Sequence, residues 1–188
     1  MRIMGIDPGT VRMGVGILDE SGDQLSLVHC GVLKVSSSLE MHFRLSELFD
    51  QLCEMADKFK PDEIAIESVF SKVNFKSAIS IGQAQALGLI VAGKMELPIH
   101  FYTPTQVKKS VTDYGLGTKQ QVQDTLKLIF GIEEDLGLYD ASDALAVSVC
   151  HANSIRFNEI IEKEVFRFLL SFTINNLKGA VYDNSARR

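Results

Sequence analysis

A strand-length apolar run stands between two helical patterns near the middle of the chain. The run is DEIAIE, residues 62–67, and it is too short for a helix. Before it, apolar residues recur at helical spacing until Pro61: Met41, Leu45, Leu48, Leu52, Met55 and Phe59. After it, residues 75–94 form a second helical pattern, and Pro98 introduces another strand, IHFYT. A strand joined through a helix to the next strand indicates parallel pairing.

The first 35 residues are expected to form an antiparallel meander. Two strand-like runs, RIMGID and VRMGVGILD, are joined by a Pro-Gly-Thr turn, and a Gly-Asp turn leads into a third run, QLSLVHCGVLKV. After Pro104 the pattern is helical, with segments around TQVKKSV, from Thr118 and from Asp140. We therefore expect an α/β fold in which helices flank a mixed five-stranded sheet.

The chain has 188 residues, of which 46% are hydrophobic, and this suits one compact domain with a substantial core. We expect that domain to span residues 1–155, followed by a helical extension over 156–178 and a disordered tail over 179–188. The amino terminus lacks the apolar run of a signal peptide, and no segment approaches the length that spans a bilayer. These features predict a cytoplasmic protein without a membrane partner.

Cysteines and histidines give no sign of a zinc site. Three widely spaced cysteines with apolar neighbours predict buried free thiols: Cys30, Cys53 and Cys150. The four histidines form no ligand pattern: His29, His42, His100 and His151.

The net charge of −5 argues against a polyanionic partner, but its distribution matters more than its sum. Between Lys72 and Lys119 the chain carries six lysines against Glu96 and Asp113, a net charge of +4. The middle of the chain is therefore a candidate surface for nucleic acid.

Four acidic residues stand where the predicted fold can gather them at one edge of the sheet. Asp7 ends the first strand and Glu67 ends DEIAIE, while Asp140 and Asp143 open a helix on one face. A structural explanation remains open for three of them: an Asx turn for Asp7, a helix cap for Asp140 and a favourable dipole contact for Asp143. A partly buried Glu67 needs a cation or hydrogen-bond donors, and no arginine is close in sequence.

Carboxylates without histidine or cysteine favour Mg²⁺ or Mn²⁺ over zinc. Two such ions about 4 Å apart activate water and stabilise the leaving oxygen in a phosphodiester displacement. The basic segment would then hold the polyanion.

Six motifs, in order along the chain, resemble the RuvC family of Holliday-junction resolvases: GIDPGT, AIE followed by SVF, GQAQA, TQVKKSVTDYG, TKQQVQ and DASDALAV. The resemblance covers nearly everything from Ile3 to about Ala152. It implies a ribonuclease-H-like fold and a homodimer that nicks two strands of a four-way DNA junction symmetrically in recombination and repair. It also implies Mg²⁺-dependent hydrolysis and cooperation with the RuvA and RuvB branch-migration proteins. From the carboxylates we expect two ions per subunit, for which Mn²⁺ can substitute.

By position, the resemblance assigns the metal-binding and catalytic acids to Asp7, Glu67, Asp140 and Asp143. It implies that Lys119 is functionally important, and we expect Lys119 to help neutralise charge at the scissile phosphate. For DNA it implies that Phe70 stacks on bases opened at the junction and that Lys108 is functionally important. We assign phosphate-backbone contacts to four lysines: Lys72, Lys76, Lys108 and Lys109.

Two departures from the family stand out. Gln85 replaces the arginine of the common GQARG motif, which removes one positive contact near the expected dimer or DNA surface. The extension after His151 is longer and more apolar than is typical of the family.

Three alternatives remain open at the level of sequence. The opening hairpin also resembles that of actin-like ATPases and sugar kinases, although the second glycine-rich hairpin that such proteins need is missing. A junction-binding protein without catalysis would have no need of all four acids. A YqgF-like nuclease would lack the lysine-rich middle.

Overall fold

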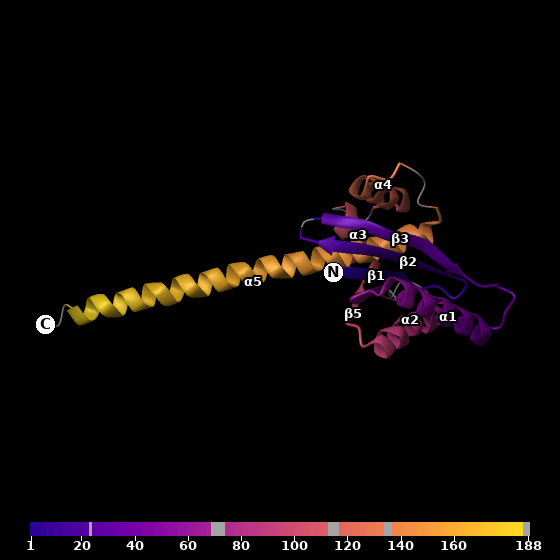
Figure 1. Ribbon diagram of the computed structural model, residues 1–188, viewed down its shortest axis with the longest axis horizontal. Coiled ribbons are helices and arrows are strands. Elements are labelled where there is room, and N and C mark those ends of the chain that lie inside the picture. The colour runs from indigo at the N-terminus through magenta and orange to yellow at the C-terminus, as the bar shows by residue number, and fades with distance from the viewer. Residues whose placement is uncertain (23, 69–73, 113–116, 134–136, 186–188) are drawn as a thin grey trace. The chain divides into compact units, whose positions relative to one another are not determined.

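The computed structural model describes residues 1–22, 24–68, 74–112, 117–133 and 137–185, with side chains up to Arg167 (Figure 1). It divides into two compact units, Met1–Ala152 and Asn153–Arg188, and each is described by itself.

The first unit is built on a five-stranded sheet in the order β3-β2-β1-β4-β5 (Figure 1). The strands are β1 (Arg2–Asp7), β2 (Arg12–Ser21), β3 (Gln24–Lys34), β4 (Glu63–Glu67) and β5 (Ile99–Tyr102). Strand β2 pairs antiparallel with β1 and β3, whereas β4 is parallel to both β1 and β5. The predicted mixed five-stranded sheet flanked by helices is confirmed.

Among the described residues, one helix precedes β4, one joins the parallel strands β4 and β5, and three follow β5. Helix α1 (Met41–Phe59) leads into β4 and α2 (Phe75–Met95) leads from β4 to β5; they are followed by α3 (Pro104–Thr112), α4 (Lys119–Phe130) and α5 (Tyr139–Ser185). Helix α4 begins with a capping box, in which Thr118 and Gln121 each bond the other's backbone N–H. The cap places Lys119 at the first position of α4.

Side-chain alternation gives the central strands two different faces. On one face, Ile64 and Ile66 are fully buried in the core with Leu48 and Leu52 of α1. On the other face, Gly5, Gly14 and Gly16 lie against the first turns of α5, where an added Cβ would overlap helix atoms. This close approach fixes the start of α5 over the ends of β1 and β2.

Helix α2 corrects one expectation from the sequence. By length and hydropathy it is long and apolar enough to cross a membrane, so the prediction that no segment approaches that length is wrong. Part of this apolar character serves the core, since Ala84, Leu87 and Val91 are buried.

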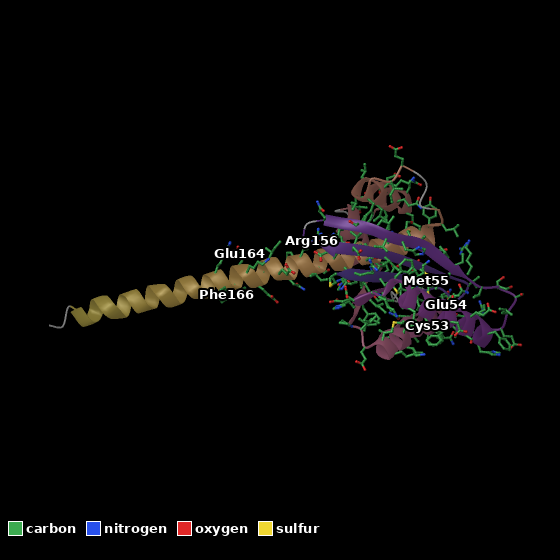
Figure 2. The ribbon with its side chains drawn as sticks, viewed as in Figure 1. Cys53, Glu54, Met55, Arg156, Glu164 and Phe166 are labelled. Atoms are coloured by element: carbon green, nitrogen blue, oxygen red, sulfur yellow. The ribbon has the colours of Figure 1, made fainter. Side chains whose placement is uncertain are left out.

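The second unit is the continuation of α5, with side chains described up to Arg167. Figure 2 shows Arg156, Glu164 and Phe166 projecting from this helix. Large apolar side chains are exposed along it: Phe157, Ile160, Ile161, Val165 and Phe166. The domain limits expected from the sequence, 1–155, 156–178 and 179–188, stay predictions.

Candidate functional site

Asp7 and Glu67 end neighbouring parallel strands. β1 and β4 pair in register up to Ile6 and Ile66, so the next residue of each strand lies at the same edge of the sheet. Both carboxyl groups line one pocket. This edge is where open α/β sheets place their ligands.

The first turn of α5 adds the second pair of acids. Because Gly14 has no side chain, the backbone of Asp140 packs directly against β2 at this position. Asp143 lines the same pocket as Asp7 and Glu67, and the charge of Asp140 acts on Asp7. The structure therefore brings all four acids into one electrostatic cluster, with Asp140 at its margin.

A pocket of about 260 Å³ lies between these elements. Its charged lining consists of Asp7, Glu67, Asp143, Lys108 and Lys119. Its apolar wall comes from α3, α4 and α5 through Pro104, Val107, Val122 and Ala146. Apolar walls lower the local dielectric and strengthen every charge interaction inside.

The carboxylates repel one another within this pocket. Burial, followed by repulsion from Glu67 and Asp143, raises the pKa of Asp7 well above its ordinary value. Burial, followed by repulsion from Asp143, also raises the pKa of Glu67. Such a set of close, mutually repelling oxygen donors fits a hard divalent cation, which would offset the repulsion.

Lys119 supplies part of the missing positive charge. Its Nζ lies 2.6 Å from Oδ2 of Asp143. Burial lowers the pKa of Lys119, but the Asp143 hydrogen bond and the charges of Asp143, Asp7 and Asp140 outweigh burial, and the net shift is upward. Lys119 is therefore firmly protonated, as a group that meets a phosphate must be.

Arg12 is a residue that the sequence reading missed. Its Nε lies 2.9 Å from Oδ2 of Asp140, so Asp140 is held by an ion pair from β2. The signal available in the sequence was its place at the start of the strand that follows the GIDPGT turn.

Of the described residues predicted to contact DNA, only one lies in the pocket. Lys108 lines the pocket, whereas Lys76 in the first turn of α2 and Lys109 on α3 are exposed outside it. Phe70 and Lys72 lie outside the described residues. Gln85 is half-buried on α2, and its effect on DNA or dimer contacts stays a prediction, as do the roles of all these residues.

The histidines and cysteines differ from expectation. The prediction that the histidines form no ligand pattern is wrong, because His100 and His151 meet Glu63 in a candidate metal-binding cluster. The three cysteines are free as predicted, but only Cys150 is buried.

Sequences of one protein family match most of the chain. The sequence model of crossover junction endodeoxyribonuclease RuvC matches residues 3–151. A crossover junction endodeoxyribonuclease RuvC of Dehalococcoides mccartyi is 39% identical over 163 residues, covering 87% of this chain and 98% of the relative. Another, from Geobacter metallireducens, is 40% identical over 161 residues, covering 86% of this chain and 98% of the relative.

Solved structures agree with these sequence matches. The structure of T. thermophilus RuvC in complex with a Holliday junction substrate matches with a TM-score of 0.79 and 28% identity, covering 84% of this chain and 96% of that one. The yeast mitochondrial Holliday junction resolvase Ydc2, at 16% identity and a TM-score of 0.56, shares the fold. The expected ribonuclease-H-like fold is confirmed. By sequence and by structure, this chain belongs to the crossover junction endodeoxyribonuclease RuvC family.

Proposed function

We propose that the chain is a structure-selective endonuclease that resolves four-way DNA junctions by paired, symmetric phosphodiester hydrolysis in recombination and repair. Its family and its likeness to a RuvC solved with a Holliday junction support this function. The observation that carries it is the pocket that joins Asp7, Glu67 and Asp143 to Lys119. Family membership does not favour the actin-like ATPase or the non-catalytic junction binder.

The residues we propose as metal ligands are Asp7, Glu67, Asp140 and Asp143, holding two Mg²⁺ ions per subunit, for which Mn²⁺ can substitute. Bound there, the ions supply an activated water and neutralise the leaving oxygen. The crowding that raises the pKa of Asp7 supports this assignment, because a divalent cation would offset the burial of its charge and the repulsion from Glu67 and Asp143.

Other residues of the pocket position and neutralise the substrate. Lys119, hydrogen-bonded to Asp143, is placed to meet the charge that develops on the scissile phosphate. Arg12 holds Asp140 in one orientation through its ion pair. Pro104, Val107 and Val122 of α3 and α4 give the pocket an apolar wall on that side.

DNA is held mainly through its phosphates in this proposal. Lys108 lines the pocket, and Lys109 is the next residue on α3. Lys76 provides a separate phosphate contact at the start of α2. Phe70 stacks on opened bases and Lys72 adds a further phosphate contact. The four arms of a junction suit a homodimer with two such sites, acting with RuvA and RuvB in the cytoplasm.

A cleavage assay with matched substrates tests the proposal. Purified protein is incubated with a synthetic four-way junction, a linear duplex of the same arm sequence, and ATP, each with and without Mg²⁺. We expect symmetric nicks in the junction alone, and only with Mg²⁺. ATP turnover without nicking would support the kinase-like alternative and overturn the proposal.

Glu67→Gln separates binding from chemistry in the same assay. The amide keeps the size and hydrogen-bonding capacity of the side chain but removes a charged oxygen donor. We expect junction binding near that of the wild type and no cleavage. Undiminished cleavage would refute the assignment of Glu67.

A further inference from the structure

A second cluster of metal-ligand side chains lies at the end of the sheet away from the acidic pocket. β4 begins with Glu63 and ends with Glu67, a separation of about 13 Å along the strand. On α5, His151 follows Asp143 by eight residues, or about 12 Å of helix. The same strand and the same helix therefore carry the acids at one end and Glu63 with His151 at the other.

Two imidazoles converge on one carboxylate oxygen in this cluster. Nε2 of His151 lies 2.8 Å from Oε2 of Glu63, and Nε2 of His100 lies 2.8 Å from the same oxygen. The two rings are 4.2 Å apart between centroids. The three candidate ligand atoms all lie within 4.8 Å of one another.

One of these contacts is not a satisfied hydrogen bond. The buried Nε2 of His100 has no hydrogen-bond partner among the described residues, although it is close to Glu63. A buried nitrogen without a partner is costly, and a cation seated between the three atoms would satisfy it. The His100 side chain is 42% exposed, so the cluster lies near the surface although its Nε2 atom is buried.

His151 is held in an orientation that suits a ligand. Its Nδ1 lies 2.8 Å from the hydroxyl oxygen of Tyr102. In the metal-free chain Nε2–H donates to Glu63, so Nδ1 accepts from the Tyr102 hydroxyl, and a metal ion would take the place of the Nε2 proton. Burial lowers the pKa of His151 below its ordinary value, against the opposing effect of its hydrogen bond to Glu63.

We propose that Glu63, His100 and His151 bind a divalent transition-metal ion, best matched by Zn²⁺, at a site separate from the acidic pocket. Two imidazoles and one carboxylate form a known zinc ligand set, and a fourth position is left for water. Tetrahedral bonds of about 2.0–2.1 Å place ligand atoms roughly 3.3 Å apart, so the two N···O separations of 2.8 Å would have to lengthen by about 0.5 Å. Imidazole donors disfavour Mg²⁺.

The bound ion would join β4, β5 and α5 close to the last residue of the first unit. It stabilises the folded chain by mass action, because the unfolded chain does not hold the three ligands together. Metal affinity should fall as pH falls, since protons compete for the imidazoles.

Zinc titration of the tag-free, metal-stripped full chain in excess Mg²⁺ tests the proposal. Calorimetry should detect one Zn²⁺ per chain, and the visible spectrum of added Co²⁺ should show nitrogen ligation. We expect His100→Gln and Glu63→Gln each to weaken zinc binding at least about tenfold. His42→Gln is the matched control, because His42 is an exposed histidine beside Glu40; it should leave binding unchanged.

Each other outcome overturns the proposal. Absence of saturable zinc binding would leave the cluster as a hydrogen-bonded group only. Equal affinity in wild type and His100→Gln would place the ion elsewhere. Loss of the zinc stoichiometry in Asp143→Asn would assign it to the acidic pocket. Circular dichroism of each variant establishes that it is folded.

Discussion

Gly14 is the point at which β2 meets the start of α5, and replacing it by alanine should displace the acids. An added Cβ would overlap the carbonyl oxygen of Asp140 and stand 2.7 Å from its carbonyl carbon. Favourable carbon contacts begin near 3.5 Å, so the first turn of α5 must move by roughly 0.8 Å or more. That turn carries Asp140 and Asp143. Since misplacement on the order of 1 Å costs about 10²-fold in rate, we expect such a loss in junction cleavage.

Single-turnover cleavage of a four-way junction measures this effect, and urea unfolding measures stability. The free energy of unfolding should fall by about 1–3 kcal/mol, the usual result of an overfilled contact. Gly93→Ala is the matched control, because a Cβ added there on α2 meets nothing; it should cleave normally and gain about 0.5–1 kcal/mol. A folded Gly14→Ala protein that cleaves within about twofold of wild type would refute the positioning argument.

Replacing single charged residues gives three more predictions. Burial and then repulsion raise the pKa of Asp7 above its ordinary value of 3.8. The folded metal-free chain therefore binds the Asp7 proton more tightly than the unfolded chain does. As a result, the free energy of unfolding rises as the pH falls from the raised pKa toward 3.8. Asp7→Asn should therefore raise the free energy of unfolding at neutral pH in EDTA and flatten its pH dependence; a less stable variant would contradict this. Arg12→Gln should slow cleavage at unchanged junction affinity and change stability by less than about 1 kcal/mol, because Arg12 is largely exposed; an unchanged rate would show that the pair does not orient Asp140. Lys76→Gln should lower the slope of log affinity against log salt concentration by about one unit. Lys60→Gln is the control, because Lys60 is an exposed residue that directly follows α1 and pairs with Asp57; it should leave the slope unchanged. Equal slopes for the two variants would count against a phosphate contact by Lys76.

Local patterns were sufficient to predict the sheet and the meeting of Asp7 with Glu67. Alternation identifies Ile64 and Ile66 as core residues, and a helix between two short strands requires parallel pairing, which brings strand ends together. The ion pair of Arg12 with Asp140 could not be predicted in this way. It depends on how closely α5 docks on β2, and that distance is set by the missing side chain at Gly14.

The histidine cluster is a second arrangement that the sequence pattern could not predict. Ligand motifs in a sequence are recognised when both ligands lie on one local element, but Glu63, His100 and His151 come from β4, β5 and α5 and are separated by dozens of residues. What joins them is the path of α5 across the strands, which begins at Gly14, passes Gly5 at Ala144 and Ser148, and reaches Glu63 at His151. Because one helix carries Asp143 and His151, a shift of α5 at Gly5 acts on both clusters, whereas a shift confined to its first turn acts on the acids alone. The positions of both clusters therefore depend on how this one helix packs against the sheet.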